Sequence, residues 1–320
     1  MIESADYFRD STAMSSDPFS DILKLTSAQS LVTGGFTAGG PWSLQFPAPD
    51  KIKFFAVVKG ACWVRIDGEP APVLFNTGDV GLLSAKRTFV LSSDSDLPPV
   101  DAMSVFSGAG KSRVTIGDGA DFAHIGGHVL LDPASSQLLA DVLPPWIHEP
   151  AASPQATAFR WLLDQLVQER ASDQPGTQLA SAQLAQLLFI QILRAHLQTA
   201  APMPAGWLRA LGDPRIAPAL RMMHGEPARA WQLDELASAC AMSRTTFALH
   251  FRTNVGVTPL AYLTEWRMRL AERALREGKS QIAVLAQSLG YASESAFSSA
   301  FKRVTGSSPR AYRLATTATD

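Results

Sequence analysis

The first half of the chain carries short apolar segments separated by turn residues. These segments are Trp42–Phe46, Phe54–Val58, Cys62–Ile66, Val80–Leu83, Phe89–Leu91 and Met103–Phe106. Asp67–Gly68 and Gly78–Asp79, which lie between them, are dipeptides typical of hairpin turns. Short apolar runs with this punctuation are typical of strands rather than helices. The pattern predicts a small β-barrel or β-sandwich.

Three longer segments downstream have helical patterns, at residues 133–143, 155–169 and 178–198. The last of them is broadly apolar, and such a stripe needs a surface to pack on. Two packing partners are possible for this stripe: neighbouring elements of the same chain, or a second copy of the chain in a dimer. Residues 199–206, with two prolines and three alanines, are expected to form an interdomain linker.

One apolar pattern occurs twice in the last third of the chain. Its four positions follow the i, i+3, i+4, i+7 spacing of a helix with one buried side. The first copy is Leu233, Leu236, Ala237 and Cys240, and the second, 49 residues later, is Ile282, Leu285, Ala286 and Leu289. Each copy therefore predicts a short amphipathic helix.

The repeat continues after these helices, with Gly290 interpreted as one extra residue in the second copy and an offset of 50 residues from there on. The matched pairs include Ser243 and Ser293, Phe247 and Phe297, Phe251 and Phe301, Gly256 and Gly306, Pro259 and Pro309, and Tyr262 and Tyr312. The serines are placed to cap a second helix, and the phenylalanines form its apolar side. Proline at a first helical position predicts a further helix, at 259–276, that joins the copies.

Two short helices joined by a tight turn, the second with one side exposed, form the geometry that enters a DNA major groove. Charge supports this interpretation: residues 207–320 carry 15 Lys and Arg against 9 Asp and Glu, whereas residues 1–206 carry 13 against 20. Arg252, Lys302 and Arg303 stand at helix ends from which they can reach phosphates. We expect helix-turn-helix units at about 233–253 and 282–303, and double-stranded DNA as the partner.

Residues 207–316 resemble the DNA-binding domain of the AraC/XylS family of transcription regulators. The segments that carry the resemblance are Leu233–Ala237, Met242–Arg244, Phe251–Arg252, Thr258–Pro259, Ile282–Tyr291, Ser293–Phe297, Phe301–Arg303, Ser308–Pro309 and Tyr312–Arg313. The resemblance implies that the second helix of each unit reads bases in adjacent major grooves. It also favours activation of transcription through contact with RNA polymerase.

The same resemblance implies eight base-reading positions, four in each unit. They are Arg244, Thr245, Ala248 and Leu249 in the first and Glu294, Ser295, Ser298 and Ser299 in the second. Leu249 and Ser299 depart from the family pattern, because many members carry an arginine there that can bind guanine with two hydrogen bonds. We therefore expect specificity to be spread over weak base contacts and DNA shape.

The first half resembles the cupin-type N-terminal domain of some AraC-like regulators. The segments that carry this second resemblance are Gly34–Phe36, Gly39–Trp42, Phe46–Pro49, Gly60–Trp63, Gly78–Val80 and Leu143–His148. It implies a barrel that binds a small effector and a dimer interface outside the DNA-binding half. The effector-binding residues remain unassigned.

A cupin barrel raises the question of a metal site. His124, His128 and His148 are the candidates, but Phe89 stands at a barrel position where a cupin ligand histidine is expected. We interpret the three histidines as hydrogen-bonded or surface groups and expect no metal, no cofactor and no catalytic residue. Cys62, beside Trp63, is expected in the core rather than as a redox sensor, which would need exposure and a lowered pKa.

Together these patterns predict an α+β chain of two domains. Residues 1–198 form the cupin-like effector-binding and dimerisation domain with its C-terminal helices, 199–206 the linker and 207–320 the DNA-binding domain. No signal peptide or membrane span is evident, which favours a cytoplasmic protein. The expected function is that of a homodimeric, effector-responsive activator. The alternatives are a cupin metalloenzyme fused to a DNA-binding domain and a constitutive DNA binder with an empty barrel.

Overall fold

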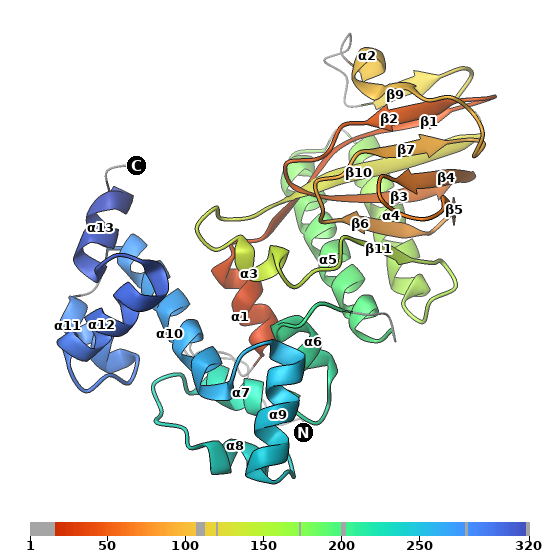
Figure 1. Cartoon of the computed structure of the whole chain (residues 1–320). Coiled ribbons are helices and arrows are strands. Elements are labelled where there is room, and N and C mark those ends of the chain that lie inside the picture. The colour runs from red at the N-terminus through yellow and green to blue at the C-terminus, as the bar shows by residue number, and fades with distance from the viewer. Residues whose placement is uncertain are drawn as a thin grey trace, which may run out of the picture. The chain divides into compact units, whose positions relative to one another are not determined.

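A computed structural model describes residues 17–106, 113–119, 121–172, 174–199, 203–278 and 281–317. The chain divides into two compact units. The sandwich unit comprises residues 27–132 and 143–203, and the helical unit comprises residues 1–26, 133–142 and 204–320 (Figure 1). Residues 17–26 and 133–142, assigned from the sequence to the first domain, thus pack with the C-terminal helices. Of the predicted linker, residues 200–202 lie outside the described residues.

The sandwich unit is built from two sheets. The larger has the strand order β11-β6-β3-β10-β1-β9, with bounds β1 Gln29–Ala38, β3 Ile52–Lys59, β6 Val80–Leu83, β9 Arg113–Ile116, β10 Phe122–Leu130 and β11 Trp146–Glu149. The smaller has the order β5-β4-β7-β2-β8, with bounds β2 Ser43–Phe46, β4 Ala61–Ile66, β5 Val73–Asn76, β7 Phe89–Ser92 and β8 Val100–Asp101. Neighbouring strands are antiparallel except for the pairs β1–β9 and β2–β8.

Alternation along the strands places the core between the two sheets. In β4, Cys62, Val64 and Ile66 are buried while the residues between them are exposed or half-buried. The same core contains Phe36, Phe55, Phe75, Phe89 and Phe122. The prediction of a β-barrel or sandwich core from the apolar segments is therefore confirmed.

Glycines shape strand β10, where Gly126 and Gly127 continue the pairing instead of ending the strand. A Cβ atom on Gly127 would lie 2.1 Å from the carbonyl oxygen of Leu31 on β1. Strands β1 and β10 approach so closely here that no side chain fits. The register between them shifts at Val32/Gly34, which marks an irregularity in β1.

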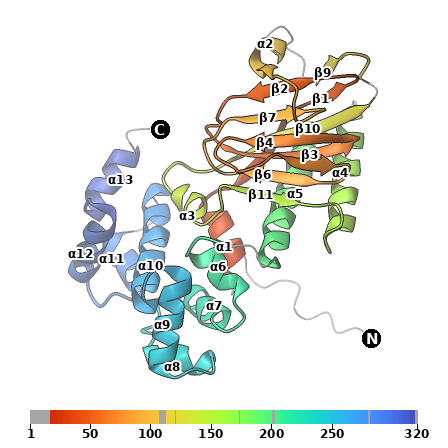
Figure 2. The same ribbon diagram turned by 45° about the vertical axis from the view of Figure 1, so that its right-hand side comes forward.

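Two long helices, α4 (Ala156–Ala171) and α5 (Thr177–Leu197), complete the sandwich unit (Figure 2). They contact each other, and α5 also contacts β1 and β11. The face of α5 that packs inside the unit includes Ala185, Leu188, Phe189, Ile192 and Leu193. Its apolar stripe is thus largely used within the chain, while Leu179 and Leu187 remain exposed.

Two predicted elements were wrong. Residues 103–106 form not a strand but part of helix α2 (Ala102–Phe106), because the Asp101 carboxylate accepts a hydrogen bond from the Met103 N–H and caps the turn. The helix predicted at 133–143 is reduced to α3 (Gln137–Ala140). It cannot extend to Leu143, since a residue before proline avoids helical geometry and Pro144 follows.

The helical unit contains α1, α3 and all helices after residue 203. Their bounds are α1 Pro18–Leu25, α6 Trp207–Gly212, α7 Ala217–Gly225, α8 Leu233–Ala239, α9 Arg244–Val255, α10 Pro259–Arg276, α11 Ile282–Ser288, α12 Glu294–Thr305 and α13 Pro309–Thr317. Helix α1 contacts α3, α6, α7 and α10. Within the described part of the chain, no helix is both long enough and apolar enough to cross a membrane.

Candidate nucleic-acid interface

The two halves of the repeat fold alike, as helix α8, turn and helix α9, and as helix α11, turn and helix α12. The Ser243 hydroxyl accepts a hydrogen bond from the Thr246 N–H at 3.2 Å, and the Ser293 hydroxyl accepts one from the Ala296 N–H at 3.1 Å. Each of these helices then ends at a glycine with positive φ, Gly256 (90°) or Gly306 (81°). Both caps follow from the sequence pattern.

The aromatic packing is also duplicated. Phe251 meets Tyr262 edge to face with ring centroids 5.9 Å apart, and Phe301 meets Tyr312 in the same way at 5.5 Å. Phe247 and Phe297 are fully buried beside them. These contacts fix one side of α9 and of α12 against helix α10 or α13, so the opposite side is left at the surface.

The turn places the extra residue of the second copy differently from the sequence interpretation. Ala241 (φ 52°) and Gly290 (φ 78°) occupy the same left-handed position, 49 residues apart. The next residues also match, since the Met242 N–H donates to the Ala237 carbonyl and the Tyr291 N–H donates to the Ala286 carbonyl. The insertion therefore falls at Ala292, and not at Gly290.

The eight residues predicted to read bases all lie on the free sides of α9 and α12. In the first unit Arg244, Thr245 and Leu249 are exposed and Ala248 is half-buried. In the second unit Glu294, Ser295 and Ser299 are exposed and Ser298 is half-buried. The two faces therefore match position by position, although their chemistry differs.

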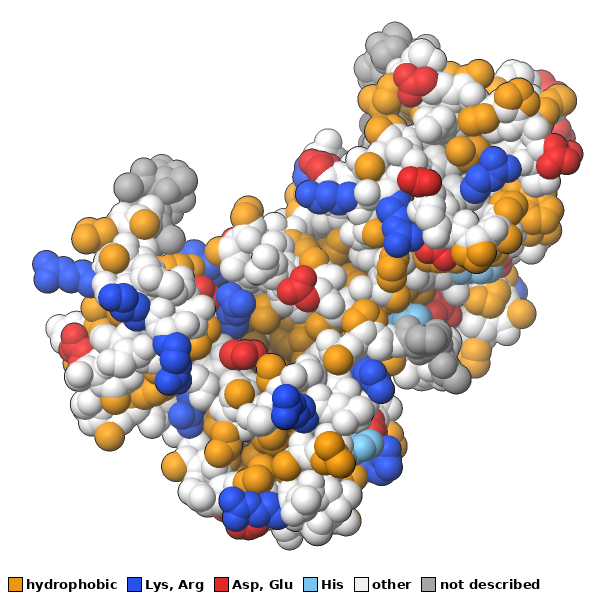
Figure 3. Space-filling model, viewed as in Figure 1, with side chains coloured by type: hydrophobic (Ala, Val, Ile, Leu, Met, Phe, Trp, Pro, Cys, Tyr) orange, Lys and Arg blue, Asp and Glu red, His pale blue; other side chains and the backbone are white. Residues whose placement is uncertain are grey.

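The three predicted phosphate contacts are exposed near the C-terminal ends of the same helices: Arg252 on α9, and Lys302 and Arg303 on α12. Figure 3 shows Lys and Arg side chains spread over the surface of the helical unit, with apolar side chains between them.

One interaction at this face was not predicted. Arg244 Nη1 lies 3.6 Å from a carboxylate oxygen of Asp234, and both side chains are largely exposed. An exposed ion pair of this kind contributes little to stability. It instead holds the guanidinium near α8 and must rearrange if Arg244 is to contact a base.

A second unpredicted feature joins the two helix-turn-helix units. Arg267, on α10, donates hydrogen bonds to the carbonyl oxygens of Pro227 and Arg229, the latter at 2.8 Å. A Cβ atom on Gly290 would lie 2.0 Å from the carbonyl oxygen of Ala228. The segment before α8 is therefore held against α10 and against the turn of the second unit. These contacts join residues that lie far apart in the sequence, so no local sequence pattern predicts them.

The first unit has an additional brace around His224. This side chain is fully buried, stacks on Trp266 with ring centroids 4.0 Å apart, and places Nε2 2.8 Å from the Tyr262 hydroxyl oxygen. Its Nδ1 lies 3.4 Å from the Asp21 carboxylate of α1. Burial lowers the pKa of His224 and outweighs the opposing effect of Asp21, so the ring is neutral near pH 7.

The sandwich unit gives no support to a resident metal. The described residues contain no group of three or more His, Cys, Asp and Glu side chains that could hold an ion. Among the described residues, no carboxylate is hydrogen-bonded to His124 or His128 of β10, whereas His148 Nε2 lies 3.0 Å from Asp79. The donor set therefore does not fit a cupin metal site.

Cys62 lies in the core of the sandwich, as predicted. It is about 1% exposed, and burial, followed by the nearby Asp79 charge, raises the pKa of its thiol to about 12. A reactive thiolate requires the opposite conditions. The geometry therefore argues against redox sensing at Cys62.

Sequence comparison matches residues 17–198 to the Cupin family and residues 236–315 to the helix-turn-helix domain family. An AraC-like transcription regulator of Streptomyces antibioticus is 42% identical over 297 residues, which cover 93% of this chain and 98% of that protein. This chain belongs to the AraC family of transcription regulators. It is a DNA-binding protein with a cupin N-terminal domain, as both resemblances in the sequence indicated.

A second relative is also named a transcriptional regulator. The transcriptional regulator AlkR of Acinetobacter baylyi is 30% identical, with 86% of this chain and 91% of that protein covered. Among solved structures, the DNA-binding domain of AdpA in complex with a target DNA is 31% identical and covers 33% of this chain and 96% of that chain, with a TM-score of 0.32.

Proposed function

We propose that this AraC-family protein is an effector-responsive transcription activator that acts as a homodimer and reads two adjacent major grooves with each subunit. The observation that carries the proposal is the matched pair of exposed faces on α9 and α12. These faces belong to two units joined by the single helix α10 and by the contacts of Arg267 and Gly290. A joined pair of this kind presents both faces to one duplex.

The proposal gives the two faces different tasks. In the first, Arg244 offers the donors suited to guanine and Leu249 an apolar contact for a thymine methyl group. In the second, Glu294 offers an acceptor for the amino group of cytosine, and the serine hydroxyls can donate or accept. Arg252, Lys302 and Arg303 contact phosphates and fix the register without reading sequence.

Dimerisation is proposed for the helical side of the sandwich unit. Trp161 on α4 and Leu179 on α5 are large apolar side chains more than half exposed, and Leu187 is also exposed. Apolar side chains at this level of exposure favour a protein partner, and a second copy of the same helices is the simplest symmetric one.

The proposed activator role includes contact with RNA polymerase. A reporter whose expression rises when the gene is deleted argues against that role.

The test is a titration of the full chain against labelled DNA flanking its own gene, with excess random competitor and at two salt concentrations. A specific complex persists under competitor, because non-specific binding rests almost wholly on counterion release. Arg244→Ala and Glu294→Gln are each expected to cost about 1–3 kcal/mol of binding at one base position. Arg160→Ala, an exposed change on α4 in the other unit, serves as the matched control.

The outcomes separate the alternatives. Loss of discrimination at two sites one helical turn apart supports two-groove reading, whereas sensitivity to Arg244→Ala alone limits reading to one groove. A complex whose affinity no small molecule alters identifies a constitutive binder. Turnover of a small substrate by the sandwich unit is the result expected of the enzyme alternative.

A further inference from the structure

Lys53 of β3 points toward the core between the two sheets. It shares a strand face with Phe55 and Val57, because every second residue of a strand points the same way. Phe55 and Val57 belong to the buried cluster between the sheets, so this face is the core face. The partner of Lys53 on β6 is Leu83, which belongs to the same cluster. A basic side chain therefore enters an apolar core.

The amino group of Lys53 reaches across to the smaller sheet. Its Nζ lies 5.7 Å from the ring centroid of Phe46 on β2 and 5.7 Å from that of Phe89 on β7. These two rings stack on each other with centroids 4.9 Å apart. Lys53 and Phe46 are half-buried, whereas Phe89 is buried. The amine thus lies against an aromatic wall at the rim of the core, where a small solute can approach it.

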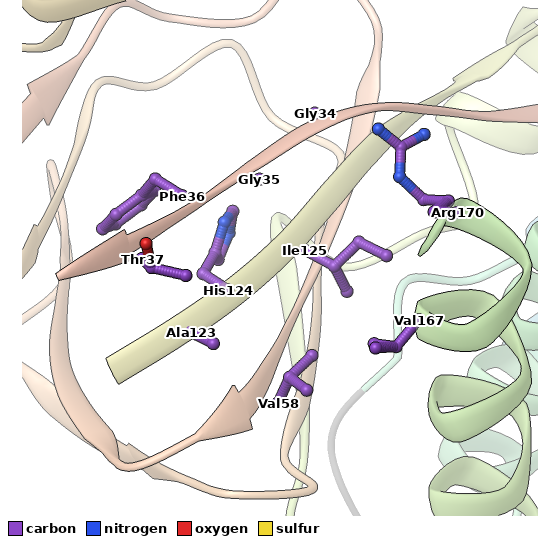
Figure 4. Close-up of a pocket in the computed structure, with 10 residues that line it drawn as sticks. All are labelled: Gly34, Gly35, Phe36, Thr37, Val58, Ala123, His124, Ile125, Val167 and Arg170. Atoms are coloured by element: carbon purple, nitrogen blue, oxygen red, sulfur yellow. The ribbon is translucent and has the colours of Figure 1, made fainter. Parts of the chain in front are cut away.

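Two histidines of β10 share this core face. Figure 4 shows the ring of His124 beside that of Phe36, and their centroids are 5.1 Å apart. His128 lies four residues further along the strand, on the same face, and is the Cα partner of Lys53. Burial, and then the charge of Lys53, lower the pKa of His128. Its imidazole is therefore neutral near pH 7 and can accept a proton.

Lys53 has no counterion to hold it in the charged form. Among the described residues, no carboxylate forms an ion pair with its amino group. The nearby Asp50 is an exposed residue. Burial lowers the pKa of Lys53, because the ammonium loses hydration that the aromatic rings replace only in part. A larger share of the side chain is therefore the neutral amine, which is the nucleophilic form.

We propose that Lys53 is a reactive amine that binds small apolar aldehydes as an imine. The nitrogen lone pair attacks the carbonyl carbon, protons pass from nitrogen to oxygen, the carbonyl oxygen leaves as water, and a C=N bond remains. The step consumes no oxidant or reductant, and water reverses it. His128 is the neutral base at hand for the proton transfer, and Phe46 and Phe89 cover the apolar part of the aldehyde. The inference rests on the proposed function, because it names the chemical class of the effector.

The experiment is reductive labelling of the full chain with butanal and cyanoborohydride, which converts an imine into a stable secondary amine that peptide mass spectrometry locates. Lys51 is the internal control, because it lies on the same short segment and is exposed. Near pH 7, Lys53 is expected to be labelled at least about threefold faster than Lys51, since a lower pKa leaves more neutral amine. Labelling of Lys53 at a rate equal to or below that of Lys51 overturns the proposal.

Two variants connect the reaction to DNA binding. Lys53→Arg keeps the positive charge but forms no imine, and Lys51→Arg is its matched control. Butanal without reductant is expected to change the affinity of the parent protein and of Lys51→Arg for specific DNA, and to leave that of Lys53→Arg unchanged. Selective labelling without any change in DNA affinity supports the reactive amine and contradicts the effector role. A different small molecule that alters DNA affinity, where butanal neither labels Lys53 nor acts, upholds the proposed function and overturns this inference alone.

Discussion

The two helix-turn-helix units share a scaffold but differ in what surrounds it. Both have a serine cap, two buried phenylalanines, a tyrosine and a glycine end. The first unit also packs on α6 and α7, which in turn contact α1, whereas the core around the second is drawn from α10 to α13. The two units therefore share the residues that the motif itself requires. They differ in the helices that pack against them and in the side chains on their exposed faces.

The largest effect expected within this comparison comes from the core of the less supported unit. Phe297→Ala removes a fully buried ring and is expected to lower the free energy of unfolding by about 3–5 kcal/mol. Urea denaturation measures the loss, and hydrogen exchange locates it. Protection is expected to fall in α11–α13 and to persist in α6–α9, where α6 and α7 contact α1.

Leu249→Ala is the control for that variant. Its side chain is 69% exposed on α9, so its removal is expected to change stability by no more than about 0.5 kcal/mol. A uniform loss of protection across both units in Phe297→Ala would show that the helical unit unfolds as one body, and the contrast in support would then have no energetic consequence.

A smaller effect should distinguish the units by pH. His224 is buried in the first unit with a lowered pKa, while the second unit, residues 281–317, contains no histidine. Below about pH 6.5 the unfolded chain binds a proton that the folded chain resists, so stability is lost as the pH falls below that value. Between pH 7.5 and 5.5 this amounts to about 1 kcal/mol.

Hydrogen exchange in α7 and α10, measured relative to α12, detects this difference. Acidification is expected to increase relative exchange in α7 and in the first half of α10. In His224→Gln, which keeps a polar group but does not titrate, that change should disappear. Equal pH sensitivity of α12 would show that groups other than His224 dominate.

The smallest effect concerns the phosphate contacts. Arg252→Gln in the first unit and Lys302→Gln in the second are each expected to reduce the slope of log affinity against log salt by about 1. The double variant should lose about 2. If only one substitution changes the slope, then only one unit touches the duplex, and the equivalence of the two faces fails.

Some elements were predictable because their signals are local. Helix α10 has the predicted bounds, since Thr258–Pro259 marks its start and a continuous periodic pattern follows. Strands β1 and β10 were not predicted from the hydrophobic pattern. Their glycine pairs at 34–35 and 126–127 imitate turn signals, and only the close approach of the two strands explains why glycine stands there.

The exposed sides of α9 and α12 were also predictable, because the repeat specifies which side of each second helix is buried. The contacts of Arg267 with the segment before α8, and of Asp21 with His224, were not. They join residues 38 to 203 positions apart, and no local pattern of polarity encodes such pairs. Sequence thus predicted which sides of α9 and α12 are exposed, but not the contacts that hold these helices in place.

Helix α1 has a practical consequence for dissecting the protein. A fragment that begins at residue 204 carries all of α6 to α13 yet lacks the helix whose Phe19 ring lies 6.2 Å from that of Trp207. Such a fragment exposes the apolar surface that α1 covers and leaves His224 without Asp21. Its solubility and affinity would then reflect a truncated core, so supplying residues 17–26 as a separate peptide is the natural way to restore the missing piece.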